Sequence, residues 1–294
     1  MKSIESSFAS QGDRCAGTLY WPQEAVTPPP VIVMAHGFGA IRAAGLMAFA
    51  DRFVAAGYAA YLFDYRGFGD SDGEPRHWVR PRRHLQDWKA AIAHARTLPQ
   101  VDGQRLVLWG TSFSGGHVIQ TAAEDHRVQA VIAQVPHVDG MISAKQAPFS
   151  TSVRLSLAAL RDVVGGLFGR PYYAPILGRP GDVAAVTSPE AWDSFFALLP
   201  AGARWENRTR ARVFLELPTY SPIRHAHKIQ APTLILAGCN DTVTPYRAAL
   251  DTARRIPKGR FELLDSDHFQ LCVGDAFKKN IAMQLEFLGQ VLPA

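Results

Sequence analysis

Short, mostly apolar runs alternate with segments of helical pattern along most of this chain, and this alternation constrains the fold more than any other feature. Apolar runs of this length are typical of strands buried on both faces of a sheet. They lie at residues 31–35, 59–63, 105–109, 128–135, 233–237 and 261–264. The spacing of apolar residues predicts helices over 43–56, 84–98, 114–124, 246–255 and 275–292. This order predicts an α/β fold with a mostly parallel sheet, helices on both faces and a ligand site at the carboxyl ends of the strands.

Two parts of the chain depart from the alternation. Residues 8–10 and 16–20 lie on either side of a turn that contains Gly12, which predicts an antiparallel hairpin. Residues 138–230 lack the alternation and are rich in helix formers and aromatic residues. A structureless loop of that length is uncommon in a compact domain. We therefore predict a core built from residues 1–137 and 231–294, interrupted by a helical cap at 138–230.

The composition argues against several classes of protein. The longest apolar runs are far shorter than the roughly 18 residues of a membrane span, and the first eight residues lack the apolar segment of a secretion signal. We expect a cytoplasmic protein without a membrane partner. The three cysteines are odd in number and widely spaced, so they suggest neither a disulfide framework nor a zinc–thiolate site.

The net charge of +5 is concentrated only in residues 76–84. No nucleic-acid-binding motif accompanies that run, so we predict no nucleic-acid partner and interpret the run as solvated surface. Attraction of an acidic substrate is the alternative interpretation. We expect a small-molecule substrate and leave the oligomeric state open, a homodimer included.

A sharp strand-to-helix turn is predicted around Ser112. The strand at 105–109 leads directly into Gly110-Thr-Ser-Phe-Ser-Gly-Gly116 and then into a helix. Such a turn raises a serine hydroxyl above the sheet, and it requires small residues two positions before and after the serine. Gly110 and Ser114 occupy those positions, which makes Ser112 the favoured nucleophile. Ser114, which lies further into the helix, is the alternative.

A serine hydroxyl is a poor nucleophile at neutral pH and needs a base that a third group orients. His268 follows the strand at 261–264, and Asp241 follows the strand at 233–237. Both loops leave the carboxyl ends of neighbouring strands, so their side chains can converge with Ser112. Asp265 and Asp267 are alternative acids, but they lie on the same loop as His268. The predicted catalytic residues are Ser112, Asp241 and His268.

With these residues the chain resembles the α/β-hydrolase family, which has the same Ser, Asp, His order. The resemblance covers residues 6–137 and 231–294. It implies that the loop beginning at His36 is an oxyanion loop, with the backbone N–H groups of Phe38 and Phe113 as the donors. The loop at 64–71, Asp-Tyr-Arg-Gly-Phe-Gly-Asp-Ser, is similar to a family loop that we interpret as structural support. The wider motif is close to bacterial esterases and to the X-Pro dipeptidyl peptidase and cocaine esterase branch.

The other histidines receive different interpretations. His36 is expected to shape the oxyanion loop by a hydrogen bond to the backbone. His137 follows a strand end and is a candidate substrate-binding residue or a plain loop residue. We interpret His117 as a packed helix residue. His225 and His227 have the spacing of two metal ligands but no evident third ligand, so we predict no metal site.

The resemblance implies a serine hydrolase that cleaves a carboxylic ester of small to medium acyl size through an acyl-enzyme, without a metal or organic cofactor. A peptidase or amidase, a thioesterase and a carbon–carbon bond hydrolase are alternatives with the same triad. Dehalogenases and epoxide hydrolases of this fold are disfavoured because they place Asp where this chain has Ser112. A ligand-binding protein without activity is the alternative from another class, although an intact set of predicted catalytic residues argues against it.

Overall fold

The computed structural model describes residues 1–146 and 148–294. Its centre is an eight-stranded sheet in the order β1-β4-β6-β5-β7-β8-β11-β12. The strands are β1 (Lys2–Glu5), β4 (Gly17–Trp21), β5 (Pro30–Ala35), β6 (Ala59–Phe63), β7 (Asp102–Thr111), β8 (Ala130–Gln134), β11 (Thr233–Gly238) and β12 (Gly259–Leu264). Every pairing from β6 to β12 is parallel, and β1 and β4 pair antiparallel at one edge. The predicted mostly parallel sheet is confirmed.

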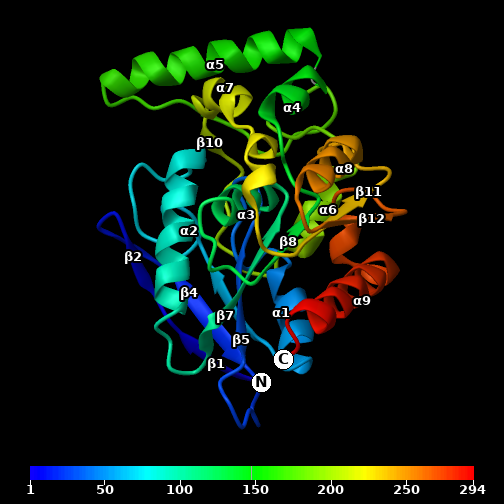
Figure 1. Ribbon diagram of the computed structural model, residues 1–294. Helices are drawn as coiled ribbons and strands as arrows, with labels where there is room; N and C mark the ends of the chain where they lie inside the picture. The colour runs from blue at the N-terminus through cyan, green and yellow to red at the C-terminus, as the bar shows by residue number, and fades with distance from the viewer. Residues whose placement is uncertain (147) are drawn as a thin grey trace.

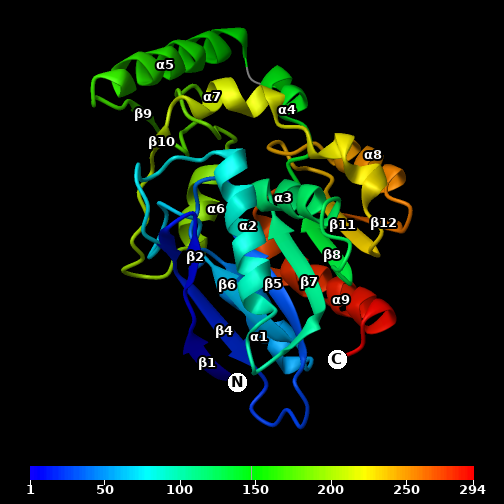
Figure 2. The same cartoon turned by 60° about the vertical axis from the view of Figure 1, so that its left-hand side comes forward.

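Helices cover both faces of the sheet (Figures 1 and 2). One face packs against α1 (Leu46–Ala55) and α9 (Gly274–Val291), and the other against α2 (Pro81–Ala95), α3 (Phe113–Ala122) and α8 (Tyr246–Arg255). Alternate residues of a strand point to opposite faces. Val31 and Val33 of β5 accordingly join the core beneath α2 and α3, whereas Ile32 and Met34 join the core beneath α1 and α9. This two-sided burial explains why β5 and β6 are apolar at every position.

The predicted hairpin between residues 8–10 and 16–20 is wrong. Gln11 and Gly12, with φ of 51° and 91°, form a tight turn that pairs β2 (Phe8–Ser10) with β3 (Asp13–Cys15). Two consecutive residues with positive φ are what a two-residue hairpin loop requires. The strand after β3 is β4, which pairs instead with β1 and β6 in the main sheet.

Residues 138–230 hold mainly helices and short turns. The longer elements are α4 (Gly140–Gln146), α5 (Phe149–Leu167), α6 (Ala191–Leu198) and α7 (Val213–Glu216). The shorter ones are the strands β9 (Tyr173–Ala174) and β10 (Thr209–Arg210) and the 3-10 helices η1 (Leu217–Thr219), η2 (Pro222–Arg224) and η3 (Ala226–Lys228). Figures 1 and 2 show α4, α5 and α7 beyond the end of the sheet that lies opposite the two termini. The boundaries predicted for a cap stay a prediction.

None of the helices in the described parts of the chain combines the length and hydropathy needed to cross a membrane.

Candidate active site

Ser112 forms the turn between β7 and α3, and its backbone is strained. Its φ of 56° and ψ of −118° lie outside the regions that side-chain-bearing residues prefer. Two hydrogen bonds tie this turn to the end of β8: Ser112 N donates to Gln134 O at 2.9 Å, and His137 N donates to Ser112 O at 2.9 Å. A Cβ at Gly110 would lie 2.2 Å from the backbone oxygen of Ser114, so only glycine fits before this turn.

Ser114, the alternative nucleophile, is fully buried. Its hydroxyl donates to the backbone oxygen of His36 at 2.5 Å and is hydrogen-bonded to the Tyr65 hydroxyl. The side chain therefore connects the loop after β5 to the start of α3. Its Oγ is already engaged away from His268, and the geometry favours Ser112.

Ser112, His268 and Asp241 are joined by hydrogen bonds in series. Ser112 Oγ lies 3.0 Å from His268 Nε2, and His268 Nδ1 lies 2.7 Å from Asp241 Oδ2. An ionised carboxylate only accepts hydrogen bonds, so Nδ1 carries the proton and Nε2 is free to accept one from the serine. Burial alone would raise the pKa of Asp241. The charge of His268 and the hydrogen bonds from His268 and Thr244 outweigh burial and hold that pKa below its ordinary value.

The two alternative acids have other partners. Asp265 Oδ1 accepts a hydrogen bond from Asn240 Nδ2 at 3.0 Å. Asp267 Oδ1 accepts from the backbone N–H groups of Phe269 and Gln270, at 2.8 Å each, and so closes the turn after His268. Only Asp241 reaches the histidine ring.

Thr244, which the sequence reasoning missed, holds the Asp241 carboxylate in place. The backbone N–H groups of Val243 and Thr244 donate to Asp241 Oδ1 at 2.7 and 2.8 Å. The Thr244 hydroxyl lies 2.8 Å from Asp241 Oδ2 and 3.1 Å from the backbone oxygen of Val135. Val135 has a φ of 38°, which is rare for a β-branched residue. A local signal was present in the sequence, because an Asp followed by a turn often accepts hydrogen bonds from backbone N–H groups two and three residues later.

The loop beginning at His36 lies against the serine. A Cβ at Gly37 would lie 3.0 Å from Ser112 Cβ, so glycine allows the close approach. As expected, His36 donates from Nδ1 to the backbone, here Gly37 O at 3.0 Å, and burial lowers its pKa to about 4. Among the described residues, the backbone N–H groups of Phe38 and Phe113 have no hydrogen-bond acceptor. Both N–H groups therefore remain available to a bound oxygen atom.

The loop at 64–71 lies next to the loop that begins at His36 and is itself held by several hydrogen bonds. Asp64 accepts hydrogen bonds from the backbone N–H groups of Arg42 and Asp70, at 2.7 and 3.2 Å. Ser71 Oγ donates to Asp64 O at 2.7 Å, and Arg66 forms a buried ion pair with Asp87. These contacts fit the structural role that we predicted for the loop.

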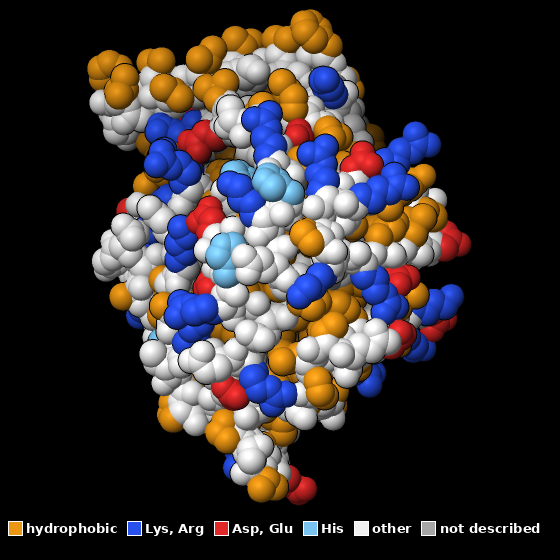
Figure 3. Space-filling model, viewed as in Figure 1, with side chains coloured by type: hydrophobic (Ala, Val, Ile, Leu, Met, Phe, Trp, Pro, Cys, Tyr) orange, Lys and Arg blue, Asp and Glu red, His pale blue; other side chains and the backbone are white. Residues whose placement is uncertain are grey.

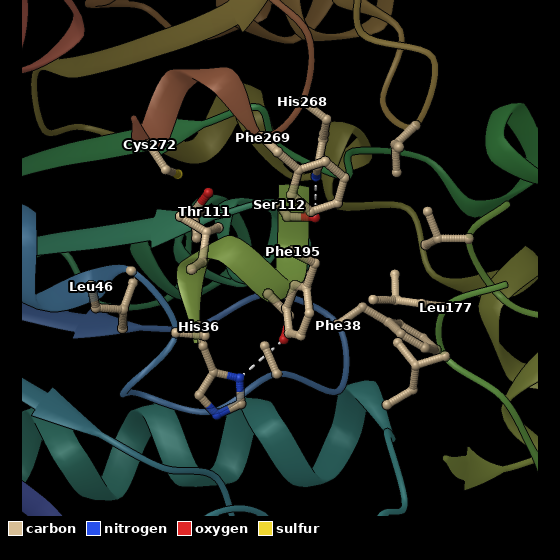
Figure 4. Close-up of a pocket in the computed structure, with 18 of the residues that line it drawn as sticks. His36, Phe38, Leu46, Thr111, Ser112, Leu177, Phe195, His268, Phe269 and Cys272 are labelled. Carbon is tan, nitrogen blue, oxygen red and sulfur yellow. Dashed lines mark hydrogen bonds between the residues drawn. The ribbon is translucent and has the colours of Figure 1, made fainter. Parts of the chain in front are cut away.

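Two cavities meet at Ser112. The first, of about 80 Å³, has almost entirely apolar walls, among them Phe49, Trp109, Ile176 and Phe195. Figure 4 shows Phe195 and Phe269 beside the hydrogen-bonded Ser112 and His268. The second, of about 330 Å³, has a more polar wall that includes His137, Ser143, Thr187, Ser188 and Thr242. His137 thus lies at a cavity wall, which is where a substrate-binding residue would have to lie.

The remaining histidines lie away from Ser112. His117 is buried in α3 and contacts the Tyr220 hydroxyl and His84, as a packed residue should. His225 and His227 lie in the turns around η2 and η3. Within the part of the chain that the structure describes, no cluster of three or more potential metal ligands occurs.

The interpretation of residues 76–84 as solvated surface is wrong in part. His77, Val79 and His84 are buried, and Arg76 donates to the backbone oxygens of Ser71 and Gly69. The run packs against the 64–71 loop and α3 through its two histidines, which contact Phe68, Tyr65 and His117.

Comparison with known sequences identifies the family. The sequence pattern described as "serine aminopeptidase, S33" matches residues 27–269. The chain belongs to this S33 family of α/β-hydrolases. The quorum-quenching protein AidA of Acinetobacter baumannii is 41% identical over 291 residues, which is 99% of this chain and 95% of AidA. The thiohydrolase aneE of Aspergillus aculeatus is 27% identical over 274 residues, which is 90% of this chain and 86% of aneE.

A solved α/β-hydrolase structure confirms the fold. The crystal structure of the α/β-hydrolase GrgF from Penicillium sp. sh18 superimposes with a TM-score of 0.85 at 24% identity and covers 99% of both chains. The α/β-hydrolase fold that we predicted is therefore established. The proposed closeness to the X-Pro peptidase and cocaine esterase branch stays a prediction.

Proposed function

We propose that this α/β-hydrolase is a serine hydrolase that cleaves a carboxylic ester of small to medium acyl size. The observation that carries the proposal is the hydrogen-bonded series from Ser112 Oγ through His268 to Asp241. The series begins at a strained strand-to-helix turn whose serine borders two cavities. This is the arrangement that turns a weak hydroxyl nucleophile into a reactive one.

In the proposed mechanism the Ser112 hydroxyl attacks the ester carbonyl and His268 Nε2 takes its proton. Asp241 keeps the imidazole in the required tautomer and stabilises its charged form. The backbone N–H groups of Phe38 and Phe113 then donate to the oxyanion, and Phe113 N is one of the unpaired N–H groups at the start of α3. His268 gives its proton to the leaving alcohol, and a water molecule activated by the same histidine hydrolyses the acyl-enzyme.

Leaving-group chemistry favours an ester over an amide. An ester releases an alcohol, whereas an amide releases an amine that must be protonated as the bond breaks. Ester cleavage therefore depends less than amide cleavage on proton donation by His268. Thioester and amide bonds are the alternatives, because aneE is called a thiohydrolase and the family is described as serine aminopeptidases. AidA is called a quorum-quenching protein, which makes a signal molecule with an ester bond a substrate worth testing.

The test is a matched series with one acyl group on three leaving groups: a p-nitrophenyl ester, the corresponding thioester and the p-nitroanilide. The series is repeated for acyl lengths from acetyl to octanoyl. At each length we expect the ester to be turned over fastest, and we expect all turnover to disappear in Ser112→Ala. A higher kcat/KM for the thioester or the anilide would replace the ester assignment. No turnover of any member, by a protein that also fails to react with serine-directed phosphonates, would indicate a ligand-binding protein instead.

A further inference from the structure

The helix α5 presents an apolar face to the surface. Figure 3 shows hydrophobic side chains along the whole length of this helix, which lies at the top of the view as in Figure 1. Eight large apolar side chains on α5 and its C-cap are between 38% and 85% exposed. They are Phe149, Val153, Leu157, Leu160, Val163, Val164, Leu167 and Phe168. We call this set the α5 face.

The orientation of the helix is set by its opposite side. Asp162 is fully buried and accepts hydrogen bonds from Arg210 Nε and Arg212 Nε, at 2.9 and 2.7 Å. It also accepts from the backbone N–H groups of Tyr172 and Arg212. Ala159, three residues earlier, is buried as well. A helix held in this way cannot rotate to bury the α5 face against its own chain.

The spacing of the α5 face suits packing against a second helix. Residues 153, 157, 160, 164 and 167 follow one another at intervals of four and three, which places them in one stripe of the kind that forms a coiled-coil seam. No charged residue lies within the stripe. Arg154 and Arg161 flank it, and the Arg161 guanidinium stacks on Tyr172 of its own chain, 4.1 Å from the ring centroid.

The size of the α5 face suits a stable interface. At these exposed fractions, with roughly 150–200 Å² for each fully exposed side chain, the eight residues present on the order of 800 Å² of apolar surface. The largest apolar patch on a typical monomer is roughly 300–600 Å². Each partner in a standard protein–protein interface contributes about 800 Å².

We propose that a second copy of this chain covers the α5 face, with the two α5 helices packed antiparallel across a twofold axis. A twofold interface requires a patch that is complementary to itself, and an uncharged apolar stripe meets that requirement. Antiparallel packing also places opposite helix dipole ends together. A membrane-surface helix, in contrast, is rich in Lys and Arg on its polar face. On α5 the polar side carries only Arg154 and Arg161 as basic residues, and Asp162 is buried against the chain itself.

Sedimentation velocity across a range of concentrations tests the oligomeric state. We expect the wild-type protein to be a dimer. The double variant Leu157→Glu, Leu160→Glu should be a monomer with unchanged far-UV circular dichroism, because it places four carboxylates at the middle of the seam. The matched control Val26→Glu, Leu263→Glu adds the same charge at exposed apolar positions elsewhere and should remain a dimer.

Cysteine crosslinking tests the pairing without depending on the stability of the charged variant. In a Cys239→Ser background, Ser156→Cys near the middle of α5 should give a disulfide-linked dimer on mild oxidation. Ser150→Cys should not, because it lies about 12 Å from the helix midpoint and the two copies would be about 24 Å apart. Crosslinking of both variants would overturn the antiparallel arrangement. A monomer at all concentrations without crosslinking, or a monomer that binds phosphatidylcholine–phosphatidylglycerol vesicles, would overturn the proposal.

Discussion

At the scale of single residues, Thr244 connects the Asp241 carboxylate to the strained end of β8. Its hydroxyl lies within hydrogen-bond reach of Asp241 Oδ2 and of the backbone oxygen of Val135. The residue after β8 has positive φ, and its neighbours hold the Ser112 turn through backbone hydrogen bonds. The positions of the acid and of the serine are thus coupled through a few residues at one strand end.

We predict that Thr244→Val lowers kcat/KM for an ester substrate roughly tenfold, because a hydrogen bond to a charged group contributes about 1.5–3 kcal/mol and about 1.4 kcal/mol is a tenfold change in rate. Thr244→Ser keeps the hydroxyl and should restore most of the activity. Steady-state kinetics of the three proteins make the comparison. An unchanged kcat/KM in Thr244→Val, or a loss in Thr244→Ser as large as that in Thr244→Val, would contradict this role of the hydroxyl.

The residues that sequence reasoning found and those it missed differ in one physical respect. Ser112, Asp241 and His268 each follow directly after an apolar strand, and parallel strands bring such positions to one edge of the sheet. Thr244 and Val135 matter through side-chain and backbone geometry within their loops, which no pattern of apolar residues encodes. Both Ser112 and Ser114 have small residues two positions before and after them. The burial of the Ser114 side chain, which only the structure shows, separates the two.

At the scale of elements, Asp162 anchors α5 to the rest of the chain. It is the buried partner of two arginines, and their hydrogen bonds outweigh burial and lower the pKa of its carboxyl. We predict that Asp162→Asn leaves both guanidinium groups without an anion and destabilises this part of the fold by about 3 kcal/mol.

Hydrogen exchange measured by mass spectrometry on peptides from residues 149–167 should therefore accelerate in Asp162→Asn. The control Asp182→Asn, at an exposed position also within residues 138–230, should exchange like the wild type there. Unchanged exchange in the Asp162 variant would mean that other contacts hold α5.

The predicted elements match the structure best where burial is two-sided. The strands β5, β6 and β11 were predicted within one residue because nearly every position is apolar, and α8 was predicted over its full length. The order of the helices in residues 138–230 could not be predicted. Apolar residues there face either the interior or the surface, as on α5, so periodicity alone does not identify the buried side.

At the scale of the whole molecule, buried histidines make stability depend on pH. His36, His84 and His117 are at most 1% exposed, and burial lowers the pKa of each, to about 4 for His36. The unfolded chain binds protons at these sites near pH 6.5, whereas the folded chain does not, so their contribution to stability is complete above pH 6.5 and is lost as the pH falls towards 4. Burial raises the pKa of Asp64 to about 6 and also raises those of Asp87 and Glu216, which opposes this trend.

Burial also lowers the pKa values of His77, His94 and His137. Because six histidines then oppose three carboxyls, we expect the free energy of unfolding to fall by roughly 2–3 kcal/mol per pH unit between pH 6 and pH 4. Urea unfolding at pH 7.5, 6, 5 and 4.5 measures the change. The slope should lessen in His84→Phe and stay as in the wild type in His126→Gln, an exposed position. A free energy that is constant over this range would contradict the account of three neutral buried imidazoles.

The central claim is that Ser112 is the nucleophile of a working serine hydrolase, and intact-mass measurement after treatment with a fluorophosphonate probe tests it most directly. The account predicts one covalent adduct on the wild type and on Ser114→Ala, and none on Ser112→Ala. Circular dichroism verifies that each variant is folded. An adduct that persists in Ser112→Ala, or a folded wild-type protein that gains no adduct at all, would contradict the account.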